Sequence, residues 1–296
     1  MSEIPRTGDD GTLATARATC HTSVMQLSAR LRNAVSRVRT TASWRRPRHL
    51  ALASITLLVA QCAPTNCAPA PAPSAGSYFG WIGVGGALPG DAACAAAVRR
   101  GGAEVRPGNG GYNATTWGPH SAEFPRATGS FTGTTDEIIQ WAACKWGFDE
   151  DTLRAQVAKE SYWTQTNLGD WTNNPANCAP GHPIGADGRG GECPESVGLM
   201  QVRTPYFRDS VEGSLRSSAY NLDIALNVWR NCYEGHETWL NTVDRGRQYG
   251  AGDAWGCIGR WFSGRWYTAP AQEYIGAVQD YLNDRIWETS SFINFR

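Results

Sequence analysis

The chain has 296 residues, of which 41% are hydrophobic and 10% aromatic, so it can bury a core and is not a wholly disordered protein. Its formal charge is zero, but residues 1–75 hold nine of the 27 basic residues and only three of the 27 acidic ones, which leaves the rest with a net charge of −6. Nucleic-acid-binding domains concentrate positive charge on their folded part. This distribution therefore argues against nucleic acid as a partner.

The first 75 residues have the features of an export segment. A basic stretch ending at Arg48 precedes an apolar run over residues 50–60. This run is too short for a bilayer, which needs about 20 residues in a helix, but it suits the hydrophobic region of a signal peptide. The Ala/Pro-rich tract at residues 68–73 is typical of an exposed linker. We therefore expect a secreted or cell-envelope protein.

Two alternatives concern the same segment. The basic region is long for a signal peptide, which is explained if Met25 is the true start or if the segment is a cytoplasmic tail on an N-terminal membrane anchor. Such an anchor would be the only membrane contact that we expect. The sequence Leu58-Val-Ala-Gln-Cys62 resembles a lipoprotein cleavage box, although Gln61 stands where a small residue is expected, so lipidation is the weaker alternative.

Six of the nine cysteines lie beyond residue 75: Cys94, Cys144, Cys178, Cys193, Cys232 and Cys257. An even number in an exported domain predicts three disulfides, and the lack of C-x-x-C pairs in the sequence disfavours zinc, so we expect no metal. The first pairing that we expect is Cys178 with Cys193, which bracket a Gly/Pro-rich loop. The second is Cys232 with Cys257.

Residues 76–130 are rich in Gly, Pro, Ala and Thr and show little periodicity. We expect them to form an irregular N-terminal strap on the neighbouring domain rather than an independent fold. A short helix is predicted near residues 91–99, where Cys94 is placed to attach it to the main body.

Regular helices are predicted from residue 134 onward. Thr134-Thr-Asp-Glu137 forms a capping box, and the helix that it begins should end at Gly147. A second helix should begin at the acidic run 149–151 and continue to Glu160. The apolar spacing predicts two further helices, near residues 220–233 and 271–287. Because only a polar loop and short β segments are expected between the second and third helices, the predicted fold class is mainly α.

Glu160 is the residue that points most directly to chemistry. At 100° per residue it lies about 20° around its helix from Leu153, with Val157 about 40° on the other side, so it shares the apolar face. A carboxyl group placed there loses hydration, and its pKa rises. Glycosidic cleavage needs a general acid of this kind. The alternative is a structural glutamate that a hydrogen bond from Ser161 or a backbone amide satisfies.

A resemblance favours the catalytic interpretation. Glu160-Ser161, followed by Gly198-Leu199-Met200-Gln201-Val202 and Pro205, resembles the signature of the soluble lytic transglycosylases, a family of the lysozyme superfamily. The resemblance covers residues 134–287. It implies an α+β lysozyme-like domain at residues 131–296, with Glu160 as the acid and base. It also implies a sugar groove that includes Ser161, Gly198, Leu199, Met200 and Gln201.

The sequence departs from this family in two places. The 36 residues between Ser161 and Gly198 exceed the short connection of the family and contain Cys178 and Cys193, so we expect a disulfide-stapled loop beside the active-site cleft. The Ala-Tyr-Asn-Ala-Gly motif of the family is replaced by Arg260-Trp-Phe-Ser-Gly264. The chain therefore resembles a divergent, cysteine-rich branch.

Aromatic residues are candidates for the sugar groove, because the C–H faces of pyranose rings pack on flat aromatic rings. We expect Trp163, Trp261 and Phe262 to line it. Four other tryptophans are expected in the core: Trp141, Trp146, Trp229 and Trp287. No cofactor is expected, since the Gly-rich run 185–191 lacks the strand and helix of a phosphate-binding loop.

The predicted function is cleavage of the β-1,4 bond between N-acetylmuramic acid and N-acetylglucosamine in peptidoglycan, by a monomer. The resemblance implies a non-hydrolytic reaction with a 1,6-anhydro product, for which one acid suffices because the muramoyl 6-hydroxyl is the nucleophile. A hydrolytic lysozyme would need a second carboxylate, about 5–9.5 Å away. Asp170 is the first candidate, followed by Glu192 and Glu195. A third alternative is a non-catalytic module that binds the cell wall.

Overall fold

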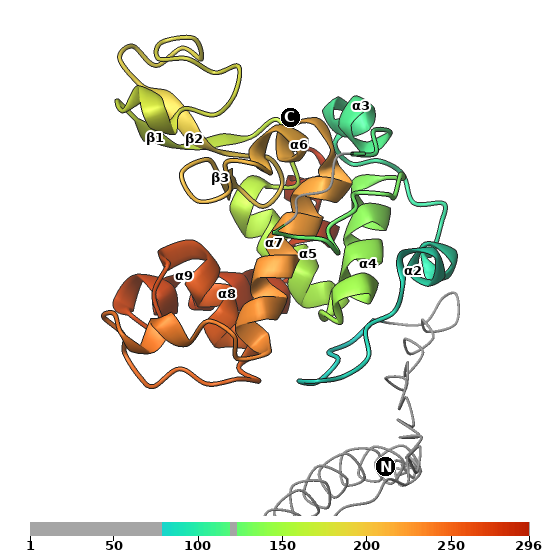
Figure 1. Cartoon of the computed structure of the whole chain (residues 1–296). Helices are drawn as coiled ribbons and strands as arrows, with labels where there is room; N and C mark the ends of the chain where they lie inside the picture. Colours follow the sequence, from blue (N-terminus) through green and yellow to red (C-terminus); the bar gives the residue numbers. More distant parts are fainter. Residues whose placement is uncertain (1–78, 119–122, 296) are drawn as a thin grey trace, which may run out of the picture. The chain divides into compact units, whose positions relative to one another are not determined.

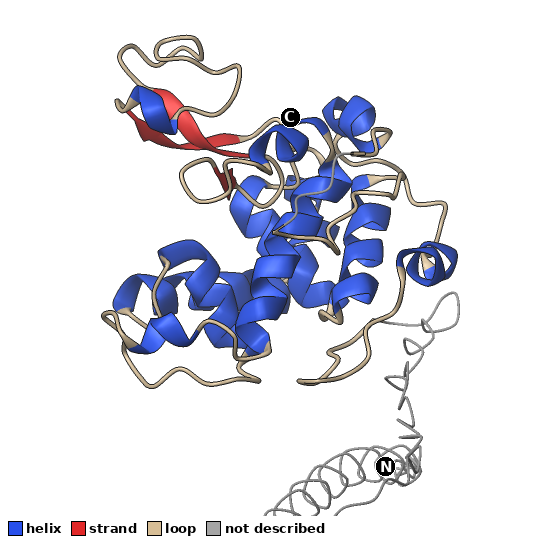
Figure 2. Cartoon of the chain, viewed as in Figure 1, coloured by secondary structure: helices blue, strands red, loops and turns tan. Residues whose placement is uncertain are grey.

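The computed structural model describes residues 79–118 and 123–295 (Figure 1). The expected export segment and linker at residues 1–75, with Met25 and the lipoprotein-like sequence ending at Cys62, lie outside the described residues. In the described part helices dominate and three short strands form one sheet (Figure 2). The predicted mainly helical class is therefore confirmed. No helix among these residues is long and apolar enough to cross a membrane.

Helix α4 (Thr135–Trp146) follows the local rules that predicted it. The hydroxyl of Thr134 accepts the backbone N–H of Glu137, and the Glu137 carboxylate accepts the backbone N–H of Thr134. These two hydrogen bonds satisfy N–H groups that a helix N-terminus otherwise leaves free. The helix ends where Gly147 adopts the left-handed conformation, with φ of +63°.

Helices α5 (Glu150–Ser161) and α7 (Ser218–Tyr233) both pack against α4 and complete the centre of the domain (Figure 1). Asp149 caps α5 by accepting the backbone N–H of Thr152 at 2.9 Å. Both helices were predicted, and α7 begins two residues earlier than the apolar spacing indicates.

A second group of helices contains α8 (Ala254–Ser263) and α9 (Ala269–Asn283), which pack against each other (Figure 1). Helix α9 also packs against α5, and α8 against α7. Helix α8 was not predicted. It contains Gly256 and Gly259, and glycine is a poor helix former. Packing explains these glycines, because a Cβ atom on Gly259 would lie 2.8 Å from Cδ1 of Ile275 on α9.

The sheet is antiparallel with strand order β1-β2-β3. Its strands are β1 (Leu168–Thr172), β2 (Cys193–Val197) and β3 (Val202–Arg203). Gly169 pairs with Ser196 across β1 and β2, and the two strands are joined by the long loop 173–192. In Figure 1 this hairpin and its loop extend away from the helices.

The segment before α4 wraps around the helices. It contains α2 (Asp91–Ala97), η1 (Pro107–Asn109) and α3 (Gly110–Asn113). The remaining short helices of the described part are α6 (Val211–Arg216), η2 (Pro175–Asn177), η3 (Thr238–Asn241), η4 (Ile286–Glu288) and α10 (Ser290–Ile293).

Three disulfides join these elements. The two expected pairs are present: Cys178–Cys193 staples the loop between β1 and β2, and Cys232–Cys257 joins α7 to α8. The third, Cys94–Cys144, attaches α2 to α4. Because all six cysteines of the domain are paired, the protein is suited to an oxidising, extracytoplasmic location.

The main core lies between α4, α5, α7, α8 and α9. The four tryptophans expected in the core, Trp141, Trp146, Trp229 and Trp287, are all buried there. The apolar face of α5 contributes Leu153 and Val157, both fully buried. Packing of this face against the core sets the direction in which the end of α5 presents Glu160.

Candidate active site

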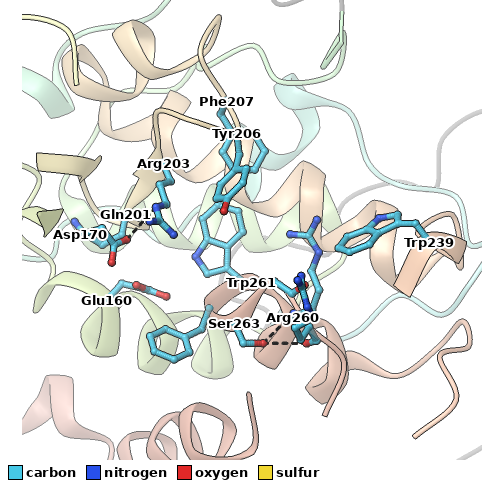
Figure 3. A pocket seen from close by; sticks show the side chains of 13 residues that line it. Glu160, Asp170, Gln201, Arg203, Tyr206, Phe207, Trp239, Arg260, Trp261 and Ser263 are labelled. Atoms are coloured by element: carbon cyan, nitrogen blue, oxygen red, sulfur yellow. Dashed lines mark hydrogen bonds and ion pairs between the residues drawn. The ribbon is translucent and has the colours of Figure 1, made fainter. Parts of the chain in front are cut away.

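A cavity of about 670 Å³ opens beside the C-terminal turn of α5 (Figure 3). In the view of Figure 3, Glu160 and Asp170 lie at one end, Trp261 in the middle and Trp239 at the other end. The lining residues come from the end of α5, strands β1 and β3, the turns beside β3, η3, and the end of α8 with the two residues after it: Glu160, Asp170, Gln201, Arg203, Tyr206, Phe207, Trp239, Arg260, Trp261, Phe262, Ser263, Gly264 and Arg265.

Glu160 is held at the wall of this cavity with a defined orientation. The hydroxyl of Tyr274, on α9, donates a hydrogen bond to Oε1 of Glu160. Tyr274 is buried, and burial raises the pKa of its hydroxyl well above 10, so the group stays protonated and remains a donor. Its ring is parallel to that of Phe262, with 4.7 Å between the ring centroids.

The pKa of Glu160 is raised from 4.5 to about 7, and burial of the carboxyl group is the largest cause. The nearby carboxylate of Asp170 contributes to this rise, because two like charges disfavour each other. The hydrogen bonds from Tyr274 and Trp261 and the charge of Lys159 oppose this rise. A carboxyl group with a pKa near 7 is protonated in a large fraction of molecules at neutral pH. It can therefore donate a proton to a bound substrate.

Asp170, on β1, reaches the same cavity. Its backbone adopts φ of +48°, which is unusual for a residue other than glycine and is often found at functional sites. The hydroxyl of Ser196, on the paired strand β2, donates a hydrogen bond to Oδ2 of Asp170. The Nε atom of Arg203, on β3, lies 3.7 Å from the same oxygen. The sheet thus fixes the half-exposed side chain of Asp170 in the cavity that Glu160 also lines.

The other candidate carboxylates do not line this cavity. Glu195 is buried and accepts hydrogen bonds from Arg203 and from the side chain of Asn177, the latter at 2.8 Å. Glu192 is partly exposed and lies 3.9 Å from Arg189 on the stapled loop. Among the described residues, Glu160 and Asp170 are therefore the carboxylates that line the cavity.

Of the segment Gly198–Gln201, only Gln201 lines the cavity. Leu199 and Met200 are buried in the core, which corrects their expected role as groove residues. They have a supporting role instead, because the carbonyl oxygen of Met200 accepts the indole N–H of Trp261 at 3.1 Å. Gly198 has φ of +81°, and a Cβ atom there would lie 2.2 Å from Nδ2 of Asn221, so the tight turn before Gln201 requires glycine.

Ser161 and Trp163 also lie away from the cavity. The hydroxyl of Ser161 donates to the carbonyl oxygen of Val157 at 3.3 Å, within α5. Trp163 is only 3% exposed, and its indole N–H donates to the carbonyl oxygen of Arg154 at 3.0 Å. The reason is a reversal of the chain: Tyr162 and Trp163 have φ of +53° and +62°, which turns Trp163 back into the core.

Trp261 and Phe262 line the cavity as expected, and three further aromatic residues join them: Tyr206, Phe207 and Trp239. Phe262 is 57% exposed, and the residues that the sequence did not indicate, Tyr206 and Trp239, are 67% and 40% exposed. Aromatic rings this accessible leave flat faces on which sugar rings can pack. Tyr206 lies in a turn and Trp239 in the short helix η3, and neither segment has a periodic apolar pattern that predicted its position.

The described part of the chain brings together no three His, Cys, Asp or Glu side chains that could hold a metal ion. The chain was also compared with models of known protein families, with curated proteins and with solved structures, and none of them matches.

Proposed function

We propose that the protein cleaves the β-1,4 bond between N-acetylmuramic acid and N-acetylglucosamine in peptidoglycan, with Glu160 as the general acid. The observation that carries the proposal is a partly buried glutamate of raised pKa, oriented by a tyrosine, in an elongated cavity with exposed aromatic rings. The three disulfides support export, and we propose secretion or a location in the cell envelope.

In the non-hydrolytic reaction, Glu160 donates its proton to the glycosidic oxygen while the bond from this oxygen to C1 of the muramoyl unit breaks. The Glu160 carboxylate then takes the proton of the muramoyl 6-hydroxyl, whose oxygen forms a bond to C1. The products are a free 4-hydroxyl and a 1,6-anhydro end, and Glu160 is protonated again. The carboxylate of Asp170 would stabilise the positive charge that develops at C1.

Hydrolysis is the second candidate, because Asp170 lines the same cavity as Glu160. In this reaction one carboxyl group protonates the leaving oxygen, and Asp170 serves as nucleophile or activates a water molecule. The product then carries a reducing end in place of the anhydro ring. The structure supports both reactions with the same acid, and the products distinguish them.

The test is mass analysis of purified peptidoglycan digested by the wild type and by three variants. Glu160→Gln should lower cleavage at least 100-fold while the fold is retained, since general acid catalysis contributes about 10²–10⁴-fold. Products lighter by one water than hydrolysed muropeptides support the anhydro reaction. Glu192→Gln, which removes an acid outside the cavity, serves as the matched control and should leave the rate unchanged.

Other outcomes would change the proposal. If Asp170→Asn costs as much activity as Glu160→Gln, and products take up oxygen-18 from water, the reaction is hydrolysis. If the wild type binds sacculi but releases no fragments, the protein is a wall-binding module without turnover. Activity of Glu160→Gln above a tenth of wild type would remove Glu160 from the role of acid.

A further inference from the structure

A second hollow, also of about 670 Å³, lies at the other end of α8. Its lining includes Ala254 and Trp255 from the first turn of α8, whereas the last turn of α8 lines the cavity of Glu160. Ten residues of helix span about 15 Å, so the two hollows are separate. We call the second one the α8 N-terminal hollow; its lining includes Trp81, Tyr233, Arg247, Asp253, Trp255 and Tyr267.

Two tryptophans of this hollow, Trp81 and Trp255, have indole N–H groups that are available to a ligand. Trp81 is 39% exposed, and Trp255 is partly exposed. Within residues 79–118 and 123–295, neither indole N–H donates to a protein acceptor, whereas the indole of Trp229 just beneath donates to the carbonyl oxygen of Ala254 at 3.3 Å. A ligand with acceptor oxygens and an apolar face would satisfy both indoles.

The Trp81 ring is held in place before any ligand arrives. Its centroid lies 4.7 Å from that of Phe148 and 5.6 Å from that of Trp229. The backbone beside it is fixed to the end of α7, because Arg230 donates to the carbonyl oxygen of Ile82 at 2.7 Å. A ring that is already ordered loses little conformational entropy on binding.

The polar groups of the hollow decide which ligand fits. Arg247 and Asp253 form an ion pair, and the hydroxyl of Tyr267 donates to Asp253 at 3.0 Å. The guanidinium of Arg247 lies 3.6 Å from the centroid of the Tyr267 ring. The guanidinium disfavours a cationic ligand and the carboxylate disfavours an anionic one. A neutral ligand rich in hydroxyl and amide groups suits both.

We propose that the α8 N-terminal hollow is an accessory glycan-binding site, which takes a neutral N-acetylated pyranose unit. The sugar ring packs on the indoles, its oxygens accept from the indole and guanidinium N–H groups, and a hydroxyl donates to Asp253. The identification of the glycan as a peptidoglycan strand rests on the proposed function. The binding of an N-acetylated sugar at this hollow does not depend on that function. The site would hold a strand near the cavity where Glu160 acts.

The test uses the full chain with Glu160→Gln, so that the ligand is not cleaved. Signals of the indole N–H groups are assigned with Trp81→Phe and Trp255→Phe and followed by heteronuclear NMR while the tetramer of N-acetylglucosamine is added. The Trp81 and Trp255 signals should shift and saturate. Arg247→Ala should weaken this binding at least about fivefold, the effect of one lost hydrogen bond of about 1 kcal/mol.

The matched control is Arg216→Ala, which removes an exposed arginine of a surface ion pair on α6 and should leave the affinity unchanged. Signals of Trp81 and Trp255 that stay in place while the Trp261 signal shifts would overturn the proposal. Equal weakening by Arg247→Ala and Arg216→Ala, or a shift caused by tetramethylammonium, would overturn it as well. Loss of wall cleavage by the wild type would contradict the proposed function and leave this result intact.

Discussion

At the scale of single residues, the position of Glu160 follows from helix geometry and that of Asp170 does not. Seven residues of helix bring Glu160 under Leu153, so the sequence predicts that the two share a face. In the structure Leu153 is fully buried, and Glu160 is partly buried at the wall of the cavity. Asp170 reaches the cavity only because β1 pairs with β2 across a loop of 20 residues, which no local rule predicts. Trp163 was expected in the groove but lies in the core, because the chain reverses at Tyr162 without a glycine that would have indicated the reversal in the sequence.

The raised pKa of Glu160 has a consequence for stability. The folded chain disfavours the ionised carboxylate, so its pKa is about 7 when folded and near 4.5 when unfolded. The free energy of unfolding therefore falls as the pH rises from about 4.5 to about 7, because the folded protein holds the proton of Glu160 more tightly than the unfolded chain does. At pH 8, Glu160→Gln should therefore raise the free energy of unfolding by about 1–2 kcal/mol relative to the wild type, after allowance for solvent screening. Urea unfolding of the two proteins measures this difference. The two proteins should differ little at pH 4, and equal stability at pH 8 would contradict the burial argument.

Tyr274→Phe should change the pH profile of cleavage. The hydroxyl of Tyr274 stabilises the ionised form of Glu160, so its removal raises the pKa of Glu160 and keeps the acid protonated at higher pH. The ratio of the rates at pH 8 and pH 6 should rise several-fold, while the phenyl ring keeps its packing on Phe262. Tyr281→Phe, on the same helix but outside the cavity, is the control. A parallel change in both variants would assign Tyr274 a purely structural role.

At the scale of elements, helices with complete end signals were predictable and α8 was not. Helix α4 has a capping box and a terminal glycine, and α5 has an aspartate cap, so neighbouring residues define their ends. The glycines of α8 lower the helix propensity of this segment, and packing against α9 compensates for the loss. The sheet was foreseen only as short β segments, because its strands are two to five residues long.

Two glycine substitutions separate packing from helix propensity. A Cβ atom at Gly259 would lie 2.8 Å from Cδ1 of Ile275 and 3.0 Å from the carbonyl oxygen of Ala271. Gly259→Ala should therefore destabilise the protein by about 1–3 kcal/mol, although alanine favours helices. Gly276, within α9, has open space around its Cα. Gly276→Ala should stabilise by about 0.5–1 kcal/mol in urea unfolding. Stabilisation by both changes would contradict the close packing of α8 on α9.

At the scale of the molecule, the segment before α4 supports the turn that follows Glu160. Arg106 donates to the carbonyl oxygens of Tyr162 and Phe292, both at 2.8 Å, and so joins the end of α5 to α10. The side chain of Asn109 donates to the carbonyl oxygen of Trp163 at 2.7 Å. These contacts link residues more than 50 positions apart. The sequence indicated an irregular strap with Cys94 as its attachment to the main body, but it did not predict these hydrogen bonds near Glu160.

A second polar connection between this segment and the helices is centred on Asp223. Its carboxylate accepts from Lys145 at 2.7 Å and from the backbone N–H groups of Thr128 and Gly129 at 2.9 Å each. Lys145 also lies 2.8 Å from Asp91 of α2. Lys145 and Asp223 are both fully buried, so the positive charge of the lysine depends on these carboxylates.

Asp223→Asn should therefore lower the free energy of unfolding by about 3–5 kcal/mol, because it leaves the buried ammonium with Asp91 as its remaining carboxylate. The change in urea midpoint measures this cost. Glu212→Gln, which breaks the exposed pair with Arg216, should change stability by less than about 0.5 kcal/mol.

Lys145→Met added to Asp223→Asn should recover part of the loss, since it removes the uncompensated charge but not the need of the two backbone N–H groups for an acceptor. Full recovery of the free energy of unfolding would mean that the backbone of Thr128 and Gly129 does not depend on this carboxylate. No recovery would mean that the uncompensated charge of Lys145 does not cause the loss of stability.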